Sequence, residues 1–267
     1  MKILLLSIPF ITTLLGFIIY RYQDKRQWQI FRLDLVQFTY LFLFAPTIYV
    51  WSKSFLFYLL RNELNLSLTP TGLFVIDTVY SVLAFVVFGA TAMHSLTKTF
   101  WLRRHHDPKF DIYSLSEYFH LYWTHIVMWN GIMILLTFIA FVNVFVPFAG
   151  ENMQKTFWAI IVLGLASGVS TFMGIWGSDP GQGNFMRLMK LCFMMFFFIH
   201  VVMYFVFDPP FKLAHSMYWF SFFHFLGGAV GAFFFEKSEK AKQVRGLWLH
   251  VGWGENKDIQ LFPFKKK

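Results

Sequence analysis

Seven long apolar stretches alternate with short polar segments along the 267 residues of the chain. Each approaches or exceeds the length of about 20 residues that a helix needs to cross a bilayer. The pattern predicts an all-α fold, a polytopic seven-transmembrane-helix bundle in residues 1–235, followed by a basic cytoplasmic tail in residues 236–267. The stretches run from Ile3 to Tyr20, Leu35 to Leu60, Gly72 to Met93, Tyr118 to Phe148, Phe157 to Trp176, Phe185 to Phe207 and Ser216 to Phe235.

The distribution of basic residues gives these stretches an orientation. Lys and Arg number four, four, two and eight in the segments 21–34, 94–117, 177–190 and 236–267, which makes 18 of the 23 in the chain. Seven crossings place these four segments on one side of the membrane, and the positive-inside rule makes that side cytoplasmic. We therefore expect the N-terminus outside and the C-terminus in the cytoplasm.

The composition agrees with a membrane bundle. Hydrophobic residues make up 57% of the chain and charged residues only 14%, which does not suit the surface of a soluble domain. The net charge of +9 comes from loops and tail, not from a soluble basic face, so nucleic acid is not an expected partner. We expect a multi-pass protein of a bacterial inner membrane or an organelle inner membrane, in contact with the lipid bilayer.

Two histidines lie well inside apolar stretches and away from their ends, where ionisable residues are expensive and are candidate functional groups. His200 and His224 stand on consecutive antiparallel stretches, each about 10–12 Å below the outer boundary. Two imidazoles at matched depth are the ligands that a b-type haem requires, and the glycines after His224 would leave room for its edge. The alternative is that each imidazole forms hydrogen bonds between helices, with Tyr204 and Ser221 as nearby partners.

Five further histidines lie between residues 94 and 125, at the predicted cytoplasmic edge. His120 and His125 point about 140° apart on one helix, so they do not bind one metal together. His94, at the predicted end of the third helix, would have to pair with one of them to bind a second haem. Hydration of histidines at the membrane surface is the alternative.

The loop before the fourth stretch offers a different metal site. Imidazole and carboxylate ligands suit copper or zinc, and a solvated loop is the alternative interpretation. The candidate ligands are His105, His106, Asp107 and Glu117.

Charged residues are otherwise rare inside the predicted spans. Asp77 lies near the outer end of the third stretch, where capping or hydration would explain it, and Lys53 can extend to the interface. No Lys lies in the middle of the seventh stretch, which excludes a retinal Schiff base. Neither broken helices nor buried charge pairs are evident, which argues against a transporter.

Two glycine pairs predict close helix packing. Gly164 and Gly168 in the fifth stretch, and Gly227 and Gly231 in the seventh, are each four residues apart and permit close approach of backbones. Ordinary helix packing explains them, although a flat glycine surface would also accommodate a planar cofactor.

Two segments resemble part of a known family. The sequences SEYFHLYWTHIVMWNG, from Ser116 to Gly131, and AHSMYWFSFFHFLGG, from Ala214 to Gly228, are similar to segments of the C subunit of copper membrane monooxygenases. The resemblance implies a multi-helical subunit of a larger assembly. The Asp and His metal ligands of that family have no match between Phe148 and Phe157, so its activity is not implied.

These observations favour an integral membrane subunit of a larger redox, respiratory-type complex that binds haem b through its histidines and passes electrons. Its expected partners are other membrane subunits and a quinone. A non-catalytic scaffold subunit, including a relative of the copper-monooxygenase C subunit without the metal ligands, is the first alternative, because Phe-rich helix surfaces and a basic tail suit partner binding. A small-molecule transporter is the second.

Overall fold

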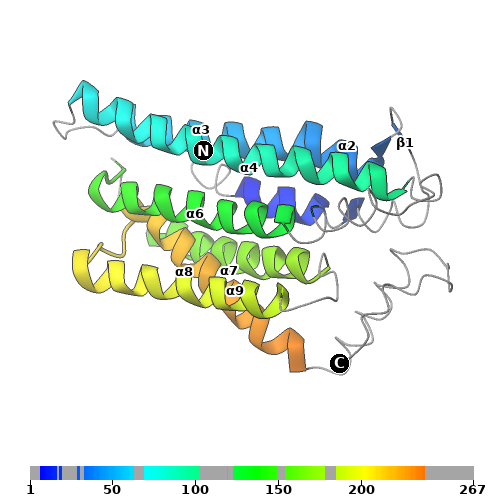
Figure 1. Ribbon diagram of the computed structural model, residues 1–267. Helices are drawn as coiled ribbons and strands as arrows, with labels where there is room; N and C mark the ends of the chain where they lie inside the picture. Colours follow the sequence, from blue (N-terminus) through cyan, green and yellow to red (C-terminus); the bar gives the residue numbers. More distant parts are fainter. Residues whose placement is uncertain are drawn as a thin grey trace, which may run out of the picture.

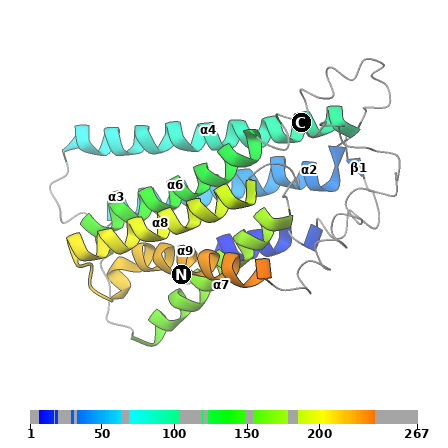
Figure 2. The ribbon, with the colours of Figure 1, turned by 60° about the horizontal axis from the view of Figure 1, so that its bottom comes forward.

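The computed structural model describes residues 7–16, 18–19, 29–30, 33–62, 69–102, 119, 123–148, 154–177 and 185–237. In this part of the chain the long helices pack against one another in a bundle (Figure 1), and a view from a second side shows the same arrangement (Figure 2). A two-residue antiparallel pair, β1 (Gln29–Ile30) with β2 (Leu33–Asp34), precedes the second helical run. The predicted helical fold is therefore confirmed.

Each of the seven predicted stretches contains a helix. The first holds the short helix Ser7–Gly16. The second holds three consecutive elements, α2 (Leu35–Thr39), the π-helix η1 (Tyr40–Phe44) and α3 (Ala45–Asn62). The remaining five hold α4 (Pro70–Leu102), α6 (Thr124–Phe145), α7 (Gln154–Gly177), α8 (Phe185–Phe207) and α9 (Ser216–Lys237), with the short 3₁₀ turn η4 (Leu213–His215) directly before α9.

Five of these helical runs are long and apolar enough to cross a membrane. The seven crossings and the orientation remain predictions. The five candidate spans are Leu35–Phe57, Pro70–Thr97, Thr124–Phe145, Trp158–Trp176 and Phe185–Phe207.

A π-helical turn interrupts the second helical run. Pro46 stands at the second position of α3, and a proline ring clashes with the carbonyl group four residues before it in a regular helix. The wider turn of η1 directly precedes the proline and relieves this clash. The helical run continues through this turn, so that Leu35–Phe57 forms one candidate span, and Pro46 was the signal for the local change in helix geometry.

The helix α4 is longer than its apolar stretch. It continues to Leu102, whereas the predicted stretch ends at Met93. Hydropathy marks only the part of a helix that suits lipid, and polar residues continue the helix here, with the hydroxyl of Thr97 donating to the carbonyl of Met93 at 2.8 Å. We had predicted that His94 stands at the end of this helix, but it lies within α4.

The closest helix pair is α7 with α9, and glycines make this approach possible. A Cβ atom at Gly168 would collide with the backbone oxygen of His224, and one at Gly227 would collide with the backbone of Leu165. A Cβ at Gly164 would stand 2.8 Å from the backbone oxygen of Phe220. The close backbone approach predicted at the two glycine pairs is confirmed, and the structure shows that the two helices approach each other.

A buried amide joins the end of α6 to the start of α9. Asn143 is fully buried, and its Oδ1 accepts hydrogen bonds from the backbone N–H groups of Met217 (3.0 Å) and Tyr218 (3.2 Å). Its Nδ2 donates to the carbonyl oxygens of Val146 and Ala214, both at 3.1 Å. Because the first N–H groups of a helix have no partner within the helix, Asn143 acts as a cap supplied by another helix.

Gly168→Ala is expected to lower the free energy of unfolding by about 2–3 kcal/mol, because the added methyl group forces α7 away from α9. Gly89→Ala is the matched control, since a Cβ at Gly89 meets nothing within 4 Å. The control is expected to stabilise α4 by up to about 1 kcal/mol through its better helix propensity. Denaturant unfolding in detergent micelles measures both, and equal effects would contradict the packing role of Gly168.

Asn143→Leu is expected to destabilise the protein by about 2–4 kcal/mol, since it leaves two N–H groups of α9 and a buried carbonyl without their partner. Asn130→Leu makes the same change in the same helix, where the amide donates to the Ile126 carbonyl of its own helix at 3.0 Å. It is expected to cost less than about 1 kcal/mol. Thermal unfolding in mild detergent compares them, and the cap is refuted if Asn143→Leu is no less stable than the control.

Candidate functional site

Two histidines from different helices meet at the end of the bundle where α4 and α6 run together. His94 belongs to α4, and His125 lies in the first turn of α6. Their Nε2 atoms are 2.9 Å apart and their ring centroids 4.8 Å apart. Of the two partners predicted for His94, the structure brings His125 to it. Close packing of the two helices continues beyond the pair, because a Cβ at Gly131 would collide with the side chain of Val87.

The separation of the two nitrogens limits what the pair can bind. Two nitrogens bound to one ion at about 2.0–2.1 Å stand about 4 Å apart when they are in line, and about 3.3–3.4 Å apart at the tetrahedral angle. A haem iron with two axial imidazoles requires the in-line arrangement. The observed 2.9 Å is thus about 0.5 Å short of a tetrahedral pair but about 1 Å short of a haem pair. It also suits one hydrogen bond between neutral imidazoles, N–H donating to the lone pair of the other.

The other predicted ligands of this region cannot be placed. His105, His106, Glu117 and His120 lie outside the described residues, on the sequence segment 103–122 that joins α4 to α6. Within the described residues no group of three or more His, Cys, Asp or Glu side chains could hold a metal ion. The described part of this site is therefore the pair of imidazoles.

His200 is fully buried in α8, and only one of its ring nitrogens has a protein partner. Its Nδ1–H donates to the carbonyl oxygen of Phe196 at 2.8 Å, while Nε2 has no hydrogen-bond partner in the described structure. The imidazole stacks on Tyr218, with ring centroids 5.9 Å apart, and its centroid lies 5.0 Å from that of Phe225. The hydrogen bond fixes the tautomer that leaves a lone pair on Nε2, which is the tautomer of a metal ligand.

His224 has its hydrogen-bond partner on α7, and its ring also stacks on that of Phe193 in α8. Its Nδ1 lies 3.1 Å from the hydroxyl oxygen of Ser167. The Phe225 ring, fully buried, lies 5.3 Å from the His224 ring, so one phenyl ring adjoins both imidazoles of the predicted haem pair.

The space that the glycine at position 228 was expected to leave for a macrocycle is filled. A Cβ at Gly228 would collide with the ring of Phe193, which itself lies 6.3 Å from the His224 ring. The predicted interhelical hydrogen bond is seen for His224, with Ser167 of α7 as the partner in place of Ser221. His200 bonds instead to the carbonyl of Phe196 in its own helix, not to Tyr204. In this packing His200 and His224 do not fit a haem.

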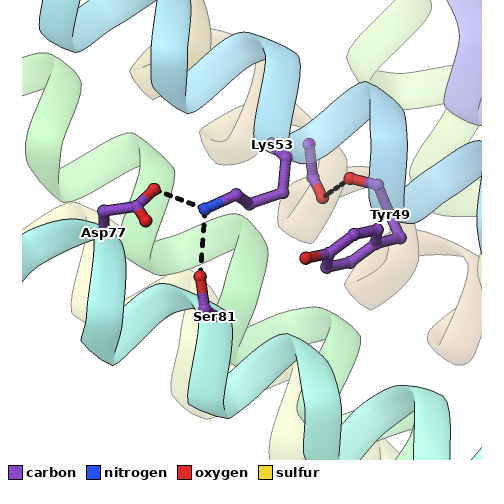
Figure 3. A network of polar contacts seen from close by, with 5 residues as sticks. Tyr49, Lys53, Asp77 and Ser81 are labelled. Atoms are coloured by element: carbon purple, nitrogen blue, oxygen red, sulfur yellow. Dashed lines mark hydrogen bonds and ion pairs between the residues drawn. The ribbon is translucent and has the colours of Figure 1, made fainter.

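An ion pair on α3 and α4 was missed in the sequence. Figure 3 shows Lys53 reaching across to α4, where its Nζ donates to the carboxylate of Asp77 and to the hydroxyl of Ser81 at 3.0 Å. The Lys53 ammonium also lies 5.9 Å from the centroid of the Tyr80 ring. The pair is an interaction that the predicted roles of Asp77, capping or interfacial hydration, did not include. Opposite charges near the same ends of two consecutive antiparallel stretches were the signal that would have found the pair.

A groove of about 670 Å³ opens beside this ion pair, between α3 and α4. Its polar end is formed by Asp77, Thr78 and Ser81, and the rest of its wall is aromatic and aliphatic. The lining residues of the groove are Pro46, Tyr49, Val50, Asp77, Thr78, Ser81, Val82, Ala84, Phe85 and Phe88.

A comparison of the chain with protein-family models, with curated proteins and with solved structures finds no match. The resemblance of residues 116–131 and 214–228 to the copper-monooxygenase C subunit therefore has the support of those segments alone. The chemistry of the described residues is the basis on which a function is proposed.

A double-mutant cycle tests the ion pair. Lys53→Leu leaves the Asp77 carboxylate without its cation, and Asp77→Leu leaves the ammonium without its carboxylate, so each is expected to lower the unfolding free energy by up to about 1 kcal/mol for this partly exposed pair. The double variant leaves neither charge and is expected to regain most of that loss. Unfolding in lipid bicelles measures the cycle, and additive losses would show that the two side chains do not interact.

Proposed function

We propose that this protein is an integral membrane subunit of a larger redox complex, and that His94 and His125 bind a transition-metal ion at one end of the bundle. The 2.9 Å approach of their Nε2 atoms is the observation that carries the proposal. Five apolar helices long enough to cross a bilayer support the membrane setting. We place the protein in a bacterial inner membrane or an organelle inner membrane.

The pair has the properties of an imidazole metal site. Both rings present Nε2 to the same point, and His125 is almost fully buried, which shields a bound ion from water. Widening the pair by about 0.5 Å admits a tetrahedral ion, which is within the reach of side-chain rotation. Imidazole ligands suit copper, zinc and iron, and among these copper and iron transfer electrons.

The chain can supply the remaining ligands of such an ion. A tetrahedral site needs four, and the segment 103–122 between α4 and α6 carries His105, His106 and His120 together with Glu117 in its sequence. Five of the nine histidines of the protein thus fall between residues 94 and 125. This concentration favours a metal function over isolated polar packing.

A non-catalytic scaffold subunit is the second candidate. It is favoured by the structural roles of the polar groups deeper in the bundle: Asn143 caps α9, and His200 and His224 are bonded to backbone or to a neighbouring helix. In that case His94 and His125 share only a proton, and the protein contributes helix surface to its complex.

Metal titration separates these candidates. The protein, purified with its lipids, is expected to bind one copper or zinc ion per chain, and His125→Ala or His94→Ala is expected to weaken binding at least tenfold. Binding is expected to fall below about pH 6.5, because protonated imidazoles do not bind metals. Equilibrium dialysis with metal analysis gives the affinity, and imidazole hyperfine splitting in the copper(II) EPR spectrum gives the ligands.

His215→Ala is the control for this experiment. His215 is buried beside α9, and its burial lowers its pKa, so it offers a neutral imidazole away from the pair. The control is expected to bind metal like the unchanged protein. A Soret band that is lost in His94→Ala would identify haem iron as the metal. Equal metal binding by all three variants would remove the support for a metal site and leave the scaffold candidate.

A further inference from the structure

The groove between α3 and α4 has one polar and one apolar end. The polar end lies near the start of the candidate span and the apolar end near its middle, which is how the headgroup and the tail of a membrane amphiphile are arranged. Asp77, at the polar end, lies about 10 Å along α4 from Pro70, where the candidate span begins. Phe88, at the other end, lies about 27 Å from Pro70, past the middle of the 28-residue span. The volume of about 670 Å³ lies within the range of about 300–1,000 Å³ typical of small-molecule sites.

The charges at the polar end select the kind of headgroup. Lys53 and Asp77 neutralise each other, so the groove presents no net charge to a ligand. The Asp77 side chain is 55% exposed, so a phosphate group that approached Lys53 would also meet the Asp77 carboxylate. The two negative charges would repel each other. A neutral headgroup meets no such repulsion.

Hydrogen-bond donors define the headgroup further. Lys53 is not itself a lining residue, but its ammonium lies beside the groove on two lining residues, Asp77 and Ser81. An ammonium has three N–H donors, and these two contacts leave the third for an acceptor on a ligand. Thr78 adds a hydroxyl to the lining, and Tyr49 adds a flat ring that suits stacking (Figure 3). A planar, neutral head with carbonyl acceptors fits these groups.

We propose that this groove binds a prenylated para-quinone, with its ring beside Tyr49, a carbonyl oxygen accepting from Lys53, and its tail along Val82, Phe85 and Phe88. The quinone is neutral, its carbonyl groups accept hydrogen bonds without carrying charge, and its tail is apolar. The residues that bind it are separate from the histidine pair.

Binding of decylubiquinone to the protein in phosphatidylcholine nanodiscs tests this site. Val82→Trp fills the groove from the α4 side and is expected to weaken binding at least tenfold. Val79→Trp is the matched control, because Val79 is exposed on the same helix (44%, against 58% for Val82) but does not line the groove. Ser81→Ala, which removes one partner of Lys53, is expected to weaken binding about threefold.

The proposal is overturned if Val82→Trp binds decylubiquinone as the unchanged protein does, or if both tryptophan variants weaken binding equally. It is also overturned if short-chain phosphatidylethanolamine displaces the quinone at equal concentration, which would make the groove a lipid site. His125→Ala is expected to bind the quinone normally, so a failure of the metal site and a failure of the groove give different results.

Discussion

The close approach of α7 and α9 is the contact on which the rest of the bundle depends. Lipid tails are as apolar as helix side chains, so helices associate in a membrane through close packing and interhelical hydrogen bonds. Gly168 lies directly against the backbone oxygen of His224, and only a residue without Cβ permits this. With α9 held there, Ser167 reaches the imidazole of His224, and Asn143 reaches the first N–H groups of α9.

A bilayer offers no hydrogen-bond partners, so polar groups inside such a bundle depend on partners within the protein, although Nε2 of His200 has none in the described structure. This requirement explains why the buried histidines that resembled haem ligands are bonded to a carbonyl (His200) and a serine (His224). Aromatic rings occupy the remaining volume around them, with Phe225 against both. His94 and His125 differ, because each faces another imidazole and the two form a symmetrical donor set.

The sequence was sufficient for the helices and for the glycine packing, since both follow from composition and from the spacing of residues on one helix. It also offered His125 as a possible partner of His94, but their approach depends on how α4 and α6 rotate against each other. Hydropathy is an average over a long segment, in which one charged residue has little weight, so it concealed the Lys53–Asp77 pair. The packing of rings around His200 depends on side-chain conformations that no pattern in the sequence specifies.

The helix α4 links the two proposed binding sites to each other. It carries Asp77 and His94 about 26 Å apart on one continuous helix. Only 22% of its span is buried, against 50% for α6, so much of α4 is left uncovered by the other described helices. Ligand sites at such a helix can change without disturbing the packing of α7, α8 and α9. The close packing of α7 with α9 and the two proposed binding sites thus lie in different parts of the bundle, and substitutions such as Val82→Trp and His125→Ala are therefore informative about function and not only about folding.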